Sequence, residues 1–140
     1  MMRLLRKIGL IGLMGLIGLI GPIGLMGCSK VTPEEQAAMA AKGYYTHLMA
    51  GQYESFLEGK FGSDTLPSDY REQLLTGYRQ FMAQQQEQHR GIIDVQVSNV
   101  VTDTLDRYTN VFLLLCYGDS TQEEIVVPMI AFADGRWRMK

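Results

Sequence analysis

The spacing of apolar residues divides the chain into three parts. Residues 8–27 contain no charged side chain, and glycine returns at every third position from Gly9 to Gly24. From residue 33 to about residue 89, apolar residues recur every three or four positions, which is typical of amphipathic helices; after Gly91 they alternate with polar residues, as in half-buried strands. The pattern therefore predicts an apolar leader, a helical segment and then a sheet.

The helical segment divides into three predicted helices. The first opens at Thr32-Pro33-Glu34-Glu35, where Thr32 can cap, proline suits the first helical position and Glu35 completes a capping box. Its apolar stripe consists of Ala37, Ala41, Tyr44 and Leu48. Gly51 interrupts the pattern, and a short second helix carries Tyr53, Phe56 and Leu57. The third opens at 66–69, presents Leu74, Tyr78 and Phe81 on one face, with Leu75 and Met82 beside them, and ends at Arg90-Gly91.

Four strands follow. The first runs to about Leu105, with Ile93, Val95 and Val97 expected on one face; the others are expected at 107–117, 121–133 and 136–140. Residues 111–115 are all apolar, which favours a central strand, and Asp134-Gly135 indicates a tight hairpin. The predicted fold class is α+β, with N-terminal helices packed on a curved four-stranded antiparallel sheet.

The leader has the order of a secretory signal: Arg3, Arg6 and Lys7 precede the apolar run, and Gly27 precedes Cys28. A transmembrane anchor is the alternative, because about 20 apolar residues span a bilayer. The repeated glycines and Pro22 argue against it, since each glycine costs about 1 kcal/mol relative to alanine within a helix.

Leu25, Gly27 and Cys28 resemble the lipobox of bacterial lipoproteins. The resemblance implies a cleaved signal peptide at 1–27, lipidation of Cys28, a tether at 28–32 and a single domain at 33–140. Two or more acyl chains anchor a protein stably, so the membrane is an expected partner. Residue 29, directly after the cysteine, is serine. An aspartate at this position would resemble an inner-membrane retention signal, so Ser29 favours an outer-membrane lipoprotein facing the periplasm.

Composition narrows the classes of function. The chain has 13 Lys and Arg, three of them in the leader, against 15 Asp and Glu, so the remainder is acidic and no nucleic-acid partner is expected. Cys116 is the one cysteine besides Cys28, and its apolar neighbours predict a buried thiol. His47 and His89 lie far apart and outside any Cys/His cluster. We therefore expect neither a metal nor a cofactor.

Residues 40–48, residues 51–56 and the Asp134-Gly135-Arg136-Trp137 hairpin resemble the nuclear transport factor 2-like superfamily. The resemblance implies an α+β cone with a pocket at its open end, whose use the fold alone does not determine. Enzymes of the superfamily use an Asp or His base and a Tyr donor, and the candidates here are Tyr44, Tyr45, Tyr78, Asp94 and His47. The pattern favours a different interpretation: the tyrosine rings pack in the core, Asp94 faces solvent and His47 lies at the rim.

A binding role without catalysis fits the sequence better. An aromatic-rich pocket suits a small apolar ligand, and its expected lining is Tyr44, Leu48, Phe56, Tyr78, Phe112 and Trp137. The same side chains could instead fill the cone. The alternatives are an assembly accessory that docks an envelope protein through its sheet, a homodimer, or a small hydrolase or isomerase.

Overall fold

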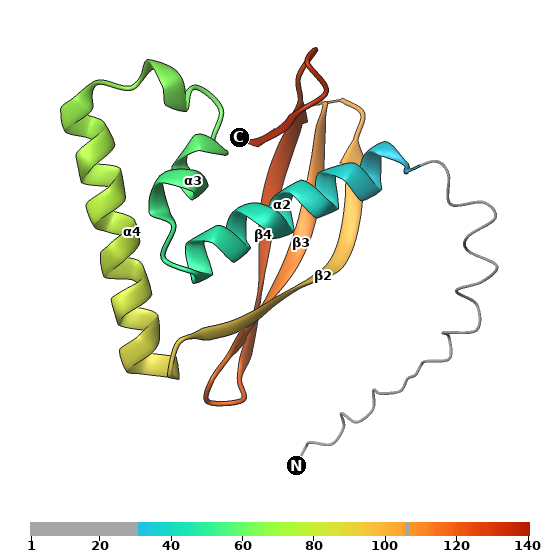
Figure 1. Ribbon diagram of the computed structural model, residues 1–140. Helices are drawn as coiled ribbons and strands as arrows, with labels where there is room; N and C mark the ends of the chain where they lie inside the picture. Colours follow the sequence, from blue (N-terminus) through green and yellow to red (C-terminus); the bar gives the residue numbers. More distant parts are fainter. Residues whose placement is uncertain (1–30, 106) are drawn as a thin grey trace. The chain divides into compact units, whose positions relative to one another are not determined.

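Helices come first and strands second along the chain (Figure 1). The computed structural model describes residues 31–105 and 107–140. The expected signal peptide and the lipidation site at Cys28 lie outside the described residues. Residues Pro33–Lys140 form one compact unit, and the description below concerns this unit.

The described residues form three α-helices and one short 3-10 helix, at α2 (Pro33–Met49), α3 (Tyr53–Glu58), η2 (Ser63–Thr65) and α4 (Ser68–His89). Helix α2 crosses one face of the sheet, and α3 lies between α2 and α4 (Figure 1). Gly51 separates α2 from α3 with a φ of 82°, a left-handed conformation that glycine adopts without strain. The helices therefore begin and end close to where the apolar spacing and the helix-end residues predict.

The four strands form an antiparallel meander in the order β2-β3-β4-β5. Their bounds are β2 (Ile92–Asp103), β3 (Tyr108–Tyr117), β4 (Gln122–Ala131) and β5 (Trp137–Met139). Strand β3 is central, between β2 and β4, as its apolar sequence predicts. The predicted α+β class, with helices on a four-stranded antiparallel sheet, is confirmed.

The core lies between α2 and the inner face of the sheet. Ala37 and Ala41 are fully buried, and their small side chains let α2 approach the strands closely. Val111 and Leu113 of β3 are fully buried beneath this helix face, and Met129 of β4 extends the same cluster. The predicted alanine-rich stripe of the first helix is thus the contact that holds the helical layer to the sheet.

The prediction for the first strand is wrong in register. The β2–β3 pairing shifts between Ile92 and Asp94 and again between Val97 and Asn99. Ile93 is 64% exposed, whereas Val95 is 2% exposed. A bulge places an extra residue in one strand and changes which side chains face the core, so simple alternation from Ile93 to Val97 does not hold.

Helix α4 is less tightly packed than α2. Leu75 is its buried residue, and Phe81, predicted on the buried face, is 37% exposed. The end of the helix is nevertheless held firmly. Arg90 and Gly91 adopt left-handed φ angles, the Gly118 N–H donates to the Gly91 carbonyl at 2.9 Å, and the Asp119 N–H donates to the His89 carbonyl at 3.0 Å. The helix is therefore fixed at its C-terminal end to the β3–β4 turn.

The outer face of the sheet is only partly covered. Strand β3 buries alternate residues, and those between them, including Phe112, Leu114 and Cys116, are half-buried. Cys116 is therefore not the core residue that its apolar neighbours predict, because alternation turns it to the outer face.

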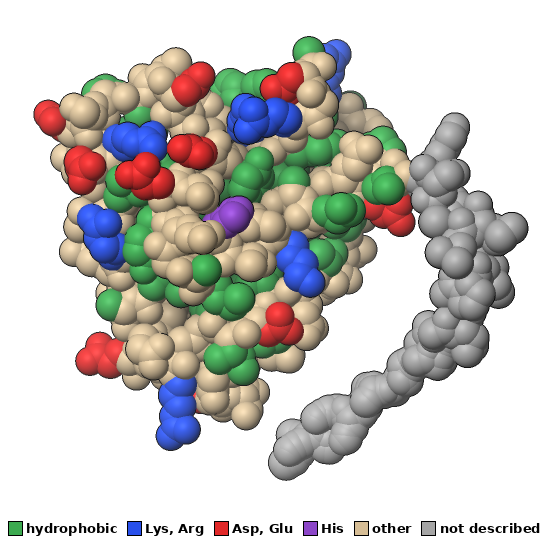
Figure 2. Space-filling model, viewed as in Figure 1, with side chains coloured by type: hydrophobic (Ala, Val, Ile, Leu, Met, Phe, Trp, Pro, Cys, Tyr) green, Lys and Arg blue, Asp and Glu red, His purple; other side chains and the backbone are tan. Residues whose placement is uncertain are grey.

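Over the described residues, no helix is long and apolar enough to cross a membrane. Acidic, basic and apolar side chains are interspersed on the face seen in Figure 2.

Candidate functional site

An apolar cavity of about 440 Å³ lies where the helices meet the inner face of β3 and β4. Its walls come from helices α2, α3 and α4, from Lys60 in the segment after α3, and from strands β3 and β4. Its lining consists of Tyr45, Leu48, Phe56, Lys60, Tyr78, Phe81, Leu115, Glu123, Ile125 and Val126. A volume of this size is in the range of small-molecule sites in proteins.

Three aromatic rings form one wall. Phe56 is buried and packs edge-to-face against Tyr45, with ring centroids 5.1 Å apart, and against Tyr78, with centroids 4.9 Å apart. Edge-to-face packing is a favoured arrangement of aromatic pairs. Because each ring comes from a different helix, this cluster fixes α2, α3 and α4 relative to one another at the cavity.

Two polar groups reach this wall without a strong partner in the described part of the chain. The Tyr78 hydroxyl oxygen is buried and has no hydrogen-bond partner there. The Lys60 ammonium lies 5.7 Å from the centre of the Phe56 ring, a cation–π contact. A buried hydroxyl without a partner loses free energy relative to a hydrogen-bonded one, so a ligand acceptor would be stabilised beside Tyr78 once a side-chain movement opened the hydroxyl to the cavity.

The ionisation of these groups follows from their burial. Burial raises the pKa of Tyr45. Burial also raises the pKa of Tyr78, with the neighbouring Tyr45 and Tyr70 adding to the effect. Both phenols are therefore neutral at physiological pH and available as donors. Burial lowers the pKa of the Lys60 ammonium, which indicates that this charge is incompletely hydrated.

Three of the six expected pocket residues line the cavity: Leu48, Phe56 and Tyr78. Tyr44 turns the other way, because its hydroxyl donates to the Trp137 carbonyl. The Trp137 ring donates through Nε1 to Gln36 Oε1 at 3.3 Å. Tyr44 and Trp137 therefore connect α2 to β5 and do not line the cavity.

Phe112 does not line it either. It is half-buried between the fully buried Val111 and Leu113, so strand alternation turns it to the outer face of the sheet. The sequence of β3 is apolar on both faces, so it carries no signal that distinguishes the inner from the outer face.

The acid–base candidates are not brought together. His47 Nδ1 lies 2.6 Å from Gln52 Oε1, in the α2–α3 connection. The Asp94 carboxylate accepts from the Val95 N–H at 2.9 Å and from Gln96 at 3.0 Å, on the exposed side of β2. Neither lines the cavity. Within residues 31–105 and 107–140, no group of three or more His, Cys, Asp or Glu side chains is arranged to hold a metal ion.

The residues predicted from the sequence to line a pocket do not include Lys60 and Glu123, the two charged residues of the lining. Glu123 accepts a hydrogen bond from the Tyr117 hydroxyl at 2.7 Å and lines the cavity beside Leu115. Its two-residue spacing from Ile125 was a usable signal, because alternate residues of a strand share a face. Lys60 lies in a connection, where no periodicity identifies the direction of a side chain.

Comparison with known proteins gives one informative match. No family model and no curated protein sequence matches the chain. A crystal structure of a Campylobacter jejuni protein, named as a candidate NTF2-like transpeptidase, superposes with a TM-score of 0.57 at 14% identity. The match covers 71% of this chain and 92% of that one. The domain has the nuclear transport factor 2-like fold. At this identity the likeness shows the fold alone, and the apolar cavity lies inside this nuclear transport factor 2-like domain.

Proposed function

We propose that the chain is a cell-envelope lipoprotein, anchored through Cys28 in the outer membrane and facing the periplasm. Its domain binds a small, mainly apolar ligand and does not catalyse a reaction on it. The observation that carries the binding role is the 440 Å³ cavity with an aromatic wall and the unpartnered Tyr78 hydroxyl. The lipobox-like Leu25, Gly27 and Cys28 support the anchor.

The chemistry of the cavity describes its ligand. Phe56, Tyr45 and Tyr78 offer ring faces and edges to an aromatic or alicyclic group. The Tyr78 hydroxyl requires an acceptor, and the nearby Lys60 ammonium favours an oxygen with partial negative charge. We therefore expect a ligand with an apolar body and one carbonyl, ether or phenolic oxygen.

Binding is proposed in preference to group transfer for a specific reason. Transfer through a covalent intermediate needs an activated nucleophile. Burial, together with the Asp94 carboxylate, raises the pKa of the Cys116 thiol. That thiol also lies in the outer-face register, between Asp94 and Gln122, away from the cavity. Because the Campylobacter protein is named as a candidate transpeptidase, muropeptides belong among the ligands to be screened.

The test is a binding screen with matched tyrosine variants. The protein is screened by thermal shift against small phenols, aromatic ketones, lipids and muropeptides, and each hit is titrated by calorimetry. Tyr78→Phe removes the hydroxyl and keeps the ring, so we expect its Kd to rise about 2- to 10-fold, the effect of one hydrogen bond. Tyr70→Phe is the control, because Tyr70 is 49% exposed and does not line the cavity.

A cavity-filling variant completes the design. Ile125→Phe places a larger side chain in the space and should abolish binding of any hit that occupies the cavity. The proposal is wrong if no compound of the panel binds saturably, or if Ile125→Phe binds every hit as well as the unaltered protein.

A further inference from the structure

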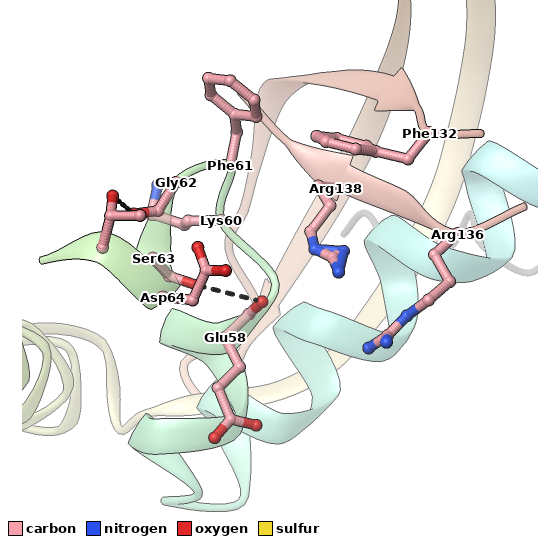
Figure 3. Close-up of a pocket in the computed structure, with 10 residues that line it drawn as sticks. Glu58, Lys60, Phe61, Gly62, Ser63, Asp64, Phe132, Arg136 and Arg138 are labelled. Carbon is pink, nitrogen blue, oxygen red and sulfur yellow. Dashed lines mark hydrogen bonds between the residues drawn. The ribbon is translucent and has the colours of Figure 1, made fainter. Parts of the chain in front are cut away.

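A second, larger hollow of about 720 Å³ lies between the segment that follows α3 and the β4–β5 hairpin. Its walls differ from those of the apolar cavity, because they carry charges of both signs as well as aromatic rings. The residues that matter for its chemistry are Glu58, Phe61, Asp64, Phe132, Arg136 and Arg138. Figure 3 shows the two arginine side chains extending into this hollow from the hairpin side.

Arg138 is held in place but lacks an acceptor. Its guanidinium carbon lies 5.2 Å from the centre of the Phe132 ring, a cation–π contact that helps to orient the side chain. Its Nη1 atom is buried and has no hydrogen-bond partner among the described residues. A buried guanidinium nitrogen without an acceptor is unfavourable, so an acceptor would be stabilised there once a side-chain movement opened this atom to the hollow.

The acidic residues of the same hollow do not neutralise the arginines. No ion pair within 4 Å joins Arg136 or Arg138 to any carboxylate of the described residues. In Figure 3 the Glu58 carboxylate points away from Arg138, and Asp64 lies on the opposite wall. The remaining cation of the lining, Lys60, places its ammonium over the Phe56 ring. The hollow thus has, on one side, two guanidinium groups that form no ion pair with the rest of the described chain.

The neighbouring rings add an apolar surface. Phe61 and Phe132 pack with centroids 5.5 Å apart, and Phe61 remains 59% exposed. The Phe61 N–H donates to the Met139 carbonyl at 2.7 Å, so the backbone of Phe61 is hydrogen-bonded to β5, next to Arg138. An exposed ring next to a guanidinium offers one surface to an apolar group and a second to an anion.

We propose that this hollow binds a small organic oxyanion, a carboxylate or a phosphate monoester, that carries an aromatic or apolar group. The oxyanion accepts from the Arg138 guanidinium and is assisted by Arg136, since charge-assisted hydrogen bonds to arginine are strong and frequently bidentate. The apolar group packs on Phe61. The two linings share Lys60, but Arg136 and Arg138 line only this hollow and Tyr78 lines only the apolar cavity, so variants of these residues test each site by itself.

The test uses the full chain in detergent, with benzoate, phenyl phosphate and benzyl alcohol as probes in calorimetric titrations. Saturable binding of benzoate or of phenyl phosphate is expected, and the tighter of the two identifies the preferred oxyanion. Benzyl alcohol, which has no charge, should bind at least tenfold more weakly. Affinity for the anion should fall as salt rises, because ions screen the attraction.

Variants assign the binding to the arginines. Arg138→Gln should weaken the Kd at least tenfold, and Arg138→Lys, which keeps the charge but loses the planar fork, should lie in between. Lys42→Gln removes one charge from the exposed side of α2 and should leave the Kd within twofold. Arg136 is exposed, so Arg136→Gln should fold normally and still weaken binding several-fold, even if Arg138→Gln is unstable.

The proposal is overturned if neither anion binds saturably, or if folded Arg138→Gln and Arg136→Gln variants bind as tightly as Lys42→Gln. Tyr78→Phe should not change anion binding; an equal loss in that variant would place the anion in the apolar cavity and also overturn the proposal.

Discussion

The same substitution, glycine to alanine, is expected to have opposite effects at Gly118 and at Gly43. Gly118 follows β3 at the turn that holds the end of α4, and its φ is outside the left-handed region. Alanine can therefore adopt its backbone conformation. The added methyl group, however, would lie 2.6 Å from the Arg90 carbonyl oxygen and 2.9 Å from the Arg90 Cβ. Gly43 lies within α2, and a methyl group there meets no atom within 4 Å.

The magnitudes follow from these contacts. A carbon 2.6 Å from a backbone oxygen cannot be accommodated by side-chain rotation, so the turn and the end of α4 must separate. Overpacking of this kind destabilises by roughly 1–3 kcal/mol. Gly43→Ala removes backbone freedom from the unfolded chain and should stabilise by about 0.5–1 kcal/mol. For a domain of this size, 1 kcal/mol corresponds to a Tm change of about 4–8 °C.

Thermal and urea unfolding, followed by circular dichroism, measure both effects. Gly118→Ala should lower the free energy of unfolding, with an unchanged dependence on urea, and Gly43→Ala should raise it. Hydrogen exchange locates the loss: the Gly118 and Asp119 N–H groups, which donate to the Gly91 and His89 carbonyls, should exchange faster in Gly118→Ala.

One result would refute the reasoning. If Gly118→Ala is as stable as the unaltered protein and its two amides exchange at the same rate, the turn is not in tight contact with Arg90. The anchoring of α4 at its C-terminal end, and with it one wall of the apolar cavity, would then need another explanation.

Two further predictions concern a carboxylate and the proposed anchor. Hydrogen bonds from the Thr121 hydroxyl, from His89 and from the Thr121 N–H lower the pKa of Asp119 from 3.8 to about 2. Because the folded pKa is below the unfolded one, Asp119 should contribute stability above about pH 4 that is lost as the pH falls toward 2. The Asp119→Asn variant should lose that contribution above pH 4, so its free energy of unfolding should change less with pH between 4 and 2. The control variant, Asp69→Asn, should keep the pH dependence of the unaltered protein. Cys28→Ala should leave an uncut precursor that incorporates no labelled palmitate; normal processing of that variant, seen by mass and by membrane fractionation, would contradict the lipoprotein proposal.

Local periodicity was sufficient for most of the fold. The change from a spacing of three or four to a spacing of two at Gly91 predicts the boundary between helices and strands, because each backbone geometry repeats its side-chain direction at a fixed interval. The stop signal at Arg90-Gly91 is equally local: both residues adopt the left-handed conformation that ends α4. These features depend on neighbours in the sequence and need no tertiary information.

The candidate site was only partly predictable. Leu48, Phe56 and Tyr78 follow from helical stripes, and the structure brings them to one cavity. Phe112 was placed on the wrong face because β3 is apolar on both sides, and Ile93 because two bulges interrupt the alternation of β2. Periodicity states which residues share a face, but not which face meets the helices.

The sequence by itself therefore determined the order and type of the elements, and the lipobox-like Leu25, Gly27 and Cys28 that motivate the proposed anchor. Tertiary structure alone decided where unpaired groups meet. Among the described residues, neither the Tyr78 hydroxyl nor Arg138 Nη1 has a hydrogen-bond partner, and Asp64 lies on the wall opposite Arg138. Both conditions arise from contacts between residues far apart in the chain, and such contacts have no period that a sequence can display.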